Sequence, residues 1–167
     1  MGIEIERKFR VLGEGWRAQA TRSVRIAQGY INDMAALREG RQNASVRVRI
    51  AGDQAFLNLK SRELGTTRQE FDYPVPVADA EALLALCVGG RIDKVRHYVD
   101  VAGHTFEVDE FRGDNAGLVV AELELESAGQ DYPRPDWLGR EVTDEPRYYN
   151  LALAERPYSR WSAQEQH

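Results

Sequence analysis

Charged side chains that could hold a phosphate chain or a metal ion recur in this sequence two residues apart and are sorted by sign. The basic sets are Arg47 and Arg49, Lys60 and Arg62, and Lys94 and Arg96. The acidic sets are Glu4 and Glu6, followed by Lys8, and then Glu122, Glu124 and Glu126. Residues two apart on a strand share one face, where like charges about 7 Å apart repel. A bound polyanion with divalent metal ions would supply the missing opposite charge.

A simpler interpretation exists for any single pair, such as Arg47 and Arg49. Charged ladders on exposed strands prevent edge-to-edge aggregation, and cross-strand pairs of Glu and Arg need no ligand. The sets taken together favour a site, because a barrel with its charged faces inward would bring them into one interior. Basic side chains would then surround one end, and the glutamates Glu4, Glu6, Glu122 and Glu124 would cluster. Carboxylates without a neighbouring imidazole or thiolate select hard cations such as Mg²⁺ or Mn²⁺.

The strands that must position these residues are indicated by alternating apolar and polar side chains. In the first strand, Ile5, Phe9 and Val11 would face one side while Glu6 and Lys8 face the other. Such runs, joined mostly by short turns, predict a mainly β, α+β fold in which an eight-stranded antiparallel sheet closes into a barrel. The eight runs are residues 3–11, 23–31, 45–50, 55–62, 67–75, 91–101, 104–111 and 118–126.

The predicted helices are few and flank the barrel. Residues 78–88 are followed by Gly89 and Gly90, which suits a helix that ends in a left-handed cap. A second helix is expected to begin after Thr143 or Asp144, to run to about residue 154 and to pack over one mouth of the barrel. We expect a single domain over residues 1–157, followed by a loosely held polar tail over residues 158–167.

Composition limits the class of protein. The 167 residues are 43% hydrophobic and 29% charged, and the mean hydropathy of -0.53 excludes a disordered or membrane-spanning chain. A net charge of -5 argues against a protein that binds duplex nucleic acid. The one cysteine, Cys87, cannot form an internal disulfide, and the charged start of the sequence is unlike a signal peptide. These features predict a cytoplasmic protein that has no membrane partner and acts on a small molecule.

The charged sets resemble, in type and order, those of the CYTH domains, also called triphosphate tunnel metalloenzymes. The N-terminal signature of that family, Glu-x-Glu-x-Lys, corresponds here to Glu4-Ile5-Glu6-Arg7-Lys8. The resemblance implies an eight-stranded tunnel, hydrolysis of a triphosphate and dependence on a divalent cation. It covers residues 2–157 and continues through Arg47-Val48-Arg49, Leu59-Lys60-Ser61-Arg62, Arg68 with Glu70, Lys94-Val95-Arg96, Asp109-Glu110-Phe111, Glu122-Leu123-Glu124, and Glu141-Val142-Thr143 before Tyr148 and Asn150.

Hydrolysis of a triphosphate mainly requires positioning and the neutralisation of charge, because the phosphate oxygens carry several negative charges. Guanidinium groups can bind these oxygens two at a time, whereas ammonium groups act as point charges. The expected substrate-binding residues are Lys8, Arg47, Arg49, Lys60, Arg62 and Arg96.

The acidic residues are expected to act through two metal ions. One ion, held by Glu122 and Glu124, would bridge phosphate oxygens, and a second, held by the catalytic residues Glu4 and Glu6, would activate the attacking water. The competing interpretation makes these glutamates cross-strand partners of the arginines. For Asp109 three interpretations stay open, namely a metal ligand, a group behind the ligands, and a partner of Arg112.

Lys94 is the candidate for proton transfer. Crowding by Arg96 and other cations disfavours its charged form, which lowers its pKa and lets it accept a proton. Tyr30, on the second strand, would hydrogen-bond Lys94, so the two form a candidate catalytic pair. An equally supported alternative makes Lys94 another phosphate ligand.

These residues together predict a hydrolase that splits inorganic tripolyphosphate into pyrophosphate and phosphate with Mg²⁺ or Mn²⁺ as cofactor. The same resemblance leaves open a thiamine or nucleoside triphosphatase, an enzyme acting on RNA 5′ ends, and an adenylate cyclase. Non-enzymatic alternatives are a module that binds polyphosphate and a purely structural barrel. A homodimer also stays open.

Overall fold

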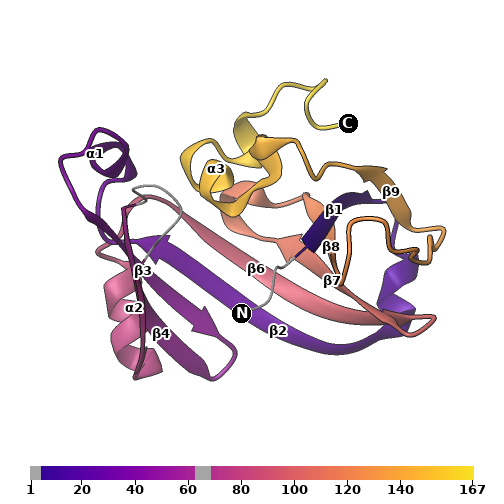
Figure 1. Ribbon diagram of the computed structural model, residues 1–167, viewed down its shortest axis with the longest axis horizontal. Coiled ribbons are helices and arrows are strands. Elements are labelled where there is room, and N and C mark those ends of the chain that lie inside the picture. The colour runs from indigo at the N-terminus through magenta and orange to yellow at the C-terminus, as the bar shows by residue number, and fades with distance from the viewer. Residues whose placement is uncertain (1–4, 63–68) are drawn as a thin grey trace.

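The alternating segments form one antiparallel sheet in the computed structural model, which describes residues 5–62 and 69–167 (Figure 1). All eight predicted strands are present, with ends shifted by a few residues, so the mainly β architecture is confirmed. In pairing order the nine strands are β5 (Glu70–Val75), β4 (Gln54–Ser61), β3 (Ala44–Ala51), β2 (Ala20–Tyr30), β6 (Val88–Val101), β7 (His104–Phe111), β8 (Val119–Leu125), β1 (Ile5–Val11) and β9 (Leu138–Glu141).

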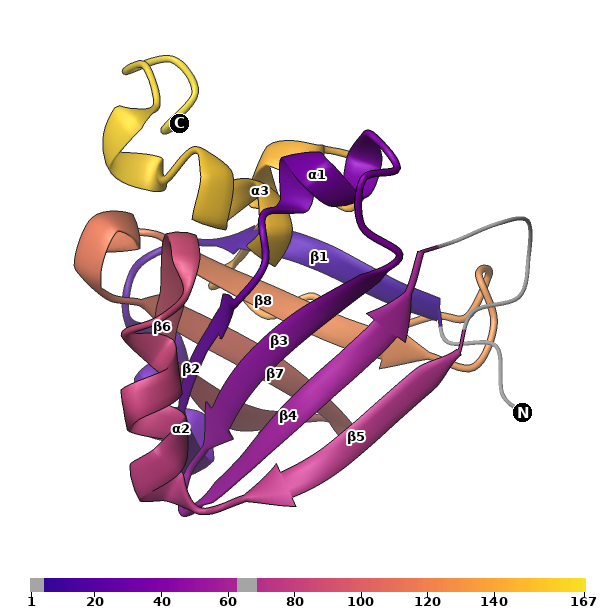
Figure 2. The ribbon, with the colours of Figure 1, turned by 90° about the vertical axis from the view of Figure 1, so that its left-hand side faces the viewer.

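The sheet does not close into a barrel. Within the described ranges its pairing order ends at β5 on one side and at β9 on the other, so the predicted closure is wrong. The unpredicted strand β9 and its neighbours occupy the edge of β1 that a closing strand would need. Leu12 N–H donates to the Trp137 carbonyl at 2.7 Å, and Val142 N–H donates to the Lys8 carbonyl at 2.7 Å. The sheet instead curls into a trough, with β3 to β5 as one wall and β7, β8 and β1 as the other (Figure 2).

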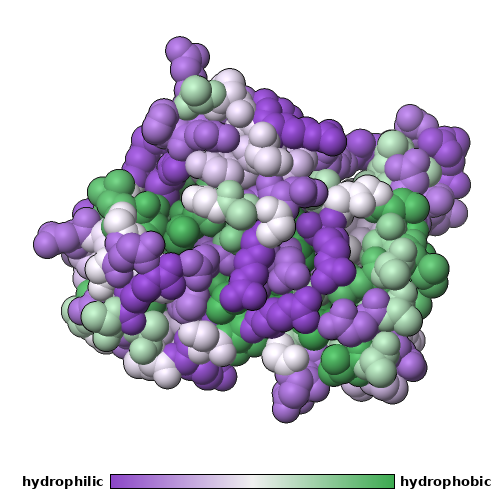
Figure 3. Space-filling model, turned by 180° about the vertical axis from the view of Figure 1, so that it is seen from behind, coloured by the Kyte–Doolittle hydropathy of each residue, from purple (hydrophilic) through white to green (hydrophobic). Residues whose placement is uncertain are grey.

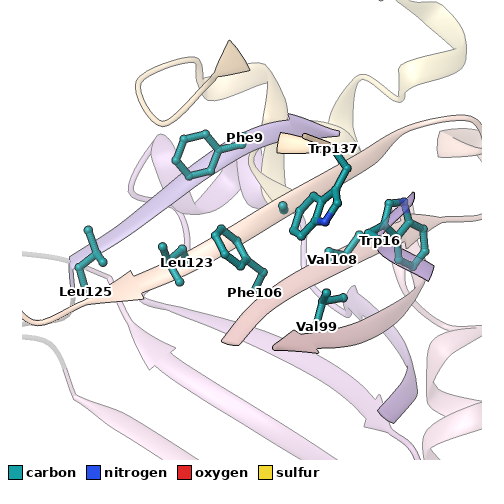
Figure 4. Close-up of a cluster of buried hydrophobic side chains, with 9 residues drawn as sticks. Phe9, Trp16, Val99, Phe106, Val108, Leu123, Leu125 and Trp137 are labelled. Atoms are coloured by element: carbon teal, nitrogen blue, oxygen red, sulfur yellow. The ribbon is translucent and has the colours of Figure 1, made fainter. Parts of the chain in front are cut away.

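Apolar side chains of the second wall pack on the outside of the trough. Phe9, Phe106 and Leu123 are buried there against Trp137, from the segment before β9 (Figure 4). Trp16, from the 3-10 helix η1 (Gly15–Gln19), closes the same cluster and is 1% exposed. Because these apolar faces point outward, the polar faces of the same strands point into the trough.

Helix α2 (Val77–Leu84) covers the outside of the first wall. Its buried residues Ala80 and Leu84 pack with Val48 and Ile50 of β3. The helix ends four residues before the predicted end at residue 88, because Val88 already pairs with Tyr30 in the sheet.

The C-terminal segment lies over one end of the trough, but it is not one continuous helix. It consists of the 3-10 helix η3 (Pro146–Tyr148) and α3 (Asn150–Glu155), and neither Thr143 nor Asp144 caps them. The Thr143 hydroxyl oxygen instead accepts from the Lys8 backbone N–H at 3.0 Å. Among the described residues, four short helices were not predicted, namely η1, α1 (Met34–Arg38), η2 (Gly113–Asn115) and η4 (Tyr158–Arg160).

The segment expected to be a loosely held tail is anchored at Trp161. Trp161 is only 5% exposed and packs edge-on against Tyr148, with ring centroids 5.0 Å apart. The same cluster includes Ile92 of β6 and Leu153 of α3. This mostly polar segment therefore contains one buried aromatic residue, Trp161, whose burial holds the segment over the end of the trough.

Hydrophilic and hydrophobic residues are mixed on the surface seen from behind (Figure 3). Large apolar side chains reach the surface at several separate places, among them Leu12, Tyr73 and Leu86. In the part of the chain that the structure describes, no helix is both long enough and apolar enough to cross a membrane.

Candidate active site

Cross-strand register gathers the predicted charged residues on the inner face of the trough. Glu6 of β1 lies opposite Glu124 of β8, and Lys8 lies opposite Glu122. The neighbouring strands repeat the arrangement, with Arg96 of β6 opposite Asp109 of β7, and Arg49 of β3 opposite Gln28 of β2. Strands distant in sequence thus contribute to one charged surface.

This surface encloses a cleft of about 640 Å³. Four cationic residues line it, namely Lys8, Arg47, Arg49 and Arg96, together with the acidic residues Glu6, Glu122 and Asp144. The other lining residues are Gln28, Thr143, Tyr149 and Asn150. Glu6 and Glu122 also line a neighbouring hollow of about 540 Å³, which they share with Glu107 and Glu124. A basic region and an acidic region therefore meet at Glu6 and Glu122.

The basic region contains guanidinium groups that lack hydrogen-bond acceptors. The Nε atoms of Arg47 and Arg49 are buried without a partner among the described residues. Burial lowers the pKa of Arg49, and the positive charges of Arg47 and Arg96 act in the same direction. Since a buried charged donor without an acceptor is unfavourable, this region is suited to an anion that supplies several oxygens.

Arg96 differs from these two arginines because carboxylates surround it. Its Nε and Nη2 atoms lie 2.8 and 2.9 Å from the two oxygens of Asp109. Its Nη1 lies 2.8 Å from Glu107, and its Nη2 also lies 3.4 Å from Glu122. Lys8 Nζ is 3.2 Å from the other oxygen of Glu122. The competing interpretation, in which glutamates pair with arginines across strands, therefore holds for Arg96 and Glu122. Arg47 and Arg49 have no carboxylate partner among the described residues.

Lys94 and Asp109 form a fully buried ion pair beneath the cleft. Each is 1% exposed, and Lys94 Nζ lies 2.8 Å from Asp109 Oδ2. Burial lowers the pKa of Lys94, and Arg96 adds to this effect, while Asp109 opposes it. Burial would raise the pKa of Asp109, but Lys94 and Arg96 hold it below its usual value. The largest cause of the lowered pKa of Lys94 is thus burial, whereas the prediction gave crowding by cations. Asp109 pairs with Lys94 and Arg96 rather than with Arg112.

The predicted contact between Tyr30 and Lys94 is wrong. Lys94 lies opposite Ile26 on β2, and Tyr30 is four residues farther along that strand, a distance of about 13 Å. The Lys94 ammonium group donates instead to Asn150 Oδ1 at 3.4 Å. Tyr30 lines a different cavity, on the other side of α3.

The buried pair gives a stability prediction. Asp109→Asn should lower the free energy of unfolding by about 3 to 5 kcal/mol, because it removes the carboxylate that pairs with the buried Lys94 and accepts two bonds from Arg96. Lys94→Met should cost less, about 2 kcal/mol, because Asp109 keeps its two bonds to Arg96. Urea unfolding measures the free energy of unfolding of both variants. A larger decrease for Lys94→Met than for Asp109→Asn would contradict this account of the network.

The acidic region centres on Glu6. Burial raises the pKa of Glu6 to about 7, and so do the charge of Glu122 and a side-chain hydrogen bond with it, while Lys8 acts in the opposite direction. Glu6 and Glu122 line the same hollow, and the charge of Lys8, 3.2 Å from Glu122, only partly offsets their repulsion. This donor set fits a hard divalent cation, because Mg²⁺ is commonly bound by one or two carboxylates together with substrate phosphates.

The described residues contain no cluster of three or more acidic, His or Cys side chains able to hold a metal ion without further ligands. Glu4, predicted as a metal ligand and catalytic residue, lies outside the described residues, as does Arg68. Asp109, also predicted as a metal ligand, has both oxygens bonded to Lys94 and Arg96. Glu6 and Glu122 are therefore the described carboxylates best placed to contribute to a metal site, which would need further ligands such as phosphate oxygens. Glu124 lies opposite Glu6.

The raised pKa of Glu6 predicts how stability depends on pH. The folded protein binds the proton of the Glu6 carboxyl group more tightly than the unfolded chain does. The contribution of this proton to the free energy of unfolding is therefore complete below about pH 4.5 and is lost as the pH rises through 7. Without metal ions, the free energy of unfolding should therefore fall more steeply across this range in the unaltered protein than in Glu6→Gln. Chemical unfolding in EDTA measures both slopes, and identical slopes would contradict the prediction.

Two predicted phosphate ligands, Lys60 and Arg62, are not among the residues that line the cleft. Lys60 is half-buried on β4, opposite Ser45. The guanidinium of Arg62 lies against Gly40, where an added Cβ would be 2.9 Å from its Nη1. Sequence reasoning missed Glu107 and Gln28, although each lies two residues from a named candidate on the same strand face. Asn150 was noted in the family pattern but was given no role.

Comparison with known proteins shows the family to which the chain belongs. Residues 2–158 match the CYTH domain, and the chain belongs to that family. It is 42% identical over 159 residues to the inorganic triphosphatase of Acetivibrio thermocellus, covering 95% of this chain and 97% of that protein. It is 35% identical over 158 residues to the inorganic triphosphatase of Nitrosomonas europaea, covering 90% and 96%. A crystal structure of an inorganic triphosphatase superposes with a TM-score of 0.73 at 33% identity, covering 92% of this chain and 95% of that one.

Proposed function

We propose that this protein is a divalent-metal-dependent hydrolase that splits inorganic tripolyphosphate into pyrophosphate and phosphate. The observation that carries the proposal is the pair of buried Nε donors of Arg47 and Arg49, which lack acceptors and line a cleft whose other side is acidic. The two relatives in Acetivibrio thermocellus and Nitrosomonas europaea, which are nearly equal in length to this chain, are both named inorganic triphosphatase. Site and family therefore support the same chemistry.

Different residues of the cleft bind phosphate, position the carboxylates and bind the metal ion. Arg47 and Arg49 bind the oxygens of one part of the phosphate chain, and Lys8 places a further positive charge near Glu122. Arg96 holds Glu107, Asp109 and Glu122 in place and adds positive potential to the cleft. When bound by Glu6, Glu122 and Glu124, a Mg²⁺ or Mn²⁺ ion would neutralise phosphate oxygens and lower the pKa of the attacking water.

Several finer assignments stay predictions. Glu4 is proposed to complete the metal-binding set, and Lys60 and Arg62 to add positive charge at the side of the cleft. Lys94 is proposed to act through Asp109, which it contacts, since it is not among the residues lining the cleft. Its protonation is open to test, as are a cytoplasmic location, a homodimer and the absence of nucleic-acid and membrane partners. The catalytic role predicted for Tyr30 has lost the contact with Lys94 on which it depended.

Phosphate release from tripolyphosphate, ATP and thiamine triphosphate tests the proposal. We expect tripolyphosphate to give equal amounts of phosphate and pyrophosphate with Mg²⁺ or Mn²⁺, and no product with EDTA. Faster turnover of ATP or thiamine triphosphate would favour those alternatives. Tight binding of tripolyphosphate without turnover would favour a binding module. No rise in melting temperature with either metal or tripolyphosphate would favour a structural role.

A further inference from the structure

Behind α3 lies a second cavity that the proposed mechanism does not use. Its volume is about 540 Å³, and it shares no lining residue with the phosphate cleft. The two spaces are nevertheless adjacent. Gln28 and Tyr30 share one face of β2, and the first lines the cleft while the second lines the cavity. Asn150 and Leu151 are consecutive in α3. Asn150 lines the cleft, and Leu151 lines the cavity. Helix α3 is therefore the wall between the two spaces.

The lining of the cavity suits an organic ring rather than a phosphate. Tyr30, Met34, Val88 and Leu151 provide aromatic and apolar walls. The one arginine there, Arg38, is already paired, because its Nη1 lies 2.6 Å from Glu155 Oε1. The volume lies within the range of about 300 to 1,000 Å³ typical of small-molecule sites. A nucleoside attached to a triphosphate in the cleft has the chemistry that such a lining accepts.

Three contacts hold the wall in place. Leu153 is fully buried in the cluster that contains Trp161. On the side of the cavity, a Cβ added at Gly90 would collide with the Ala154 carbonyl oxygen, so β6 and α3 are in close contact. The ion pair of Arg38 with Glu155 joins α3 to α1, and the two helices lie near each other in Figure 2. The first contact anchors α3 to the core, and the ion pair fixes its outer end.

We propose that α3, fixed by the ion pair of Arg38 with Glu155, determines specificity by separating the phosphate cleft from the cavity that a nucleoside would need. A bare tripolyphosphate fits the cleft with the wall in place. The base and ribose of a nucleoside triphosphate need the space behind it. This inference rests on the proposed function and names two specificity-determining residues for it.

The ratio of kcat/KM for ATP to kcat/KM for tripolyphosphate tests the proposal in Arg38→Ala and Glu155→Ala. The ratio should rise about five-fold in each, which is the upper range for loss of an exposed ion pair, while activity on tripolyphosphate stays within two-fold. Arg41→Ala is the matched control, because Arg41 lies in the same connection and pairs with its neighbour Glu39. The double exchange Arg38→Glu with Glu155→Arg should restore the low ratio.

A second variant locates the effect in the cavity. Val88→Trp in the Arg38→Ala background fills the space and should cancel the gain for ATP. An unchanged ratio in both alanine variants, an equal rise in Arg41→Ala, or no effect of Val88→Trp would overturn the proposal. If the unaltered protein does not hydrolyse tripolyphosphate, the proposed function itself fails, so the two failures are distinguishable.

Discussion

Arg49→Met is expected to weaken the binding of tripolyphosphate about 100-fold and, in the ligand-free protein, to raise the melting temperature. The first effect follows from the loss of charge-assisted hydrogen bonds to phosphate, each worth about 1.5 to 3 kcal/mol. The second follows because the Nε of Arg49 is buried without an acceptor and the positive charges of Arg47 and Arg96 disfavour its charge. Calorimetric titration and thermal unfolding measure the two effects on the same sample.

Weaker binding together with a higher melting temperature distinguishes an arginine that binds the ligand from one that stabilises the fold. Arg25→Met is the matched control, because Arg25 lies on β2 and forms surface ion pairs with Glu81 and Asp93. It should leave tripolyphosphate binding unchanged and should not raise the melting temperature. Arg49→Lys keeps the charge but loses the planar two-donor geometry, so it should recover only part of the affinity. A lower melting temperature for Arg49→Met with unchanged affinity would show that Arg49 serves folding alone.

The strands and their inner faces could be predicted because one signal determines both. The alternation that defines a strand also assigns its faces, so Arg47 and Arg49 fall on the same side as soon as Val48 is placed in the core. Val48 is fully buried. The same rule would have found Glu107, which lies two residues before Asp109 and contacts Arg96.

Closure of the sheet could not be predicted because it depends on competition for one strand edge. Four residues of β9 are too few to show alternation, yet β9 and the flanking residues satisfy the edge of β1 from Lys8 to Leu12. Period-two patterns specify which face a residue occupies and leave open which strand its backbone pairs with. The same limit explains the error for Tyr30, whose face was predictable but whose position along β2 relative to Lys94 was set by register.

Glu122→Gln is expected to reduce kcat/KM for tripolyphosphate about 100- to 1,000-fold and also to destabilise the fold. Glu122 is 8% exposed, and it contacts Lys8 at 3.2 Å and Arg96 at 3.4 Å. Removing one group that stabilises charge in the transition state typically lowers the rate by this factor. Loss of the carboxylate that pairs with the buried Lys8 and also contacts Arg96 should lower the free energy of unfolding by about 1 to 3 kcal/mol.

Glu124→Gln separates these two roles, because Glu124 lies on the same strand face, opposite Glu6, but is exposed. If both glutamates bind a metal ion, both variants lose the rise in melting temperature that Mg²⁺ or Mn²⁺ causes, while only Glu122→Gln loses stability in EDTA. If Glu122 is only the partner of Lys8 and Arg96, Glu122→Gln destabilises the protein in EDTA but keeps its response to metal. Thermal unfolding with and without metal distinguishes these outcomes before any turnover is measured, so a folding defect in Glu122→Gln cannot be mistaken for a catalytic one.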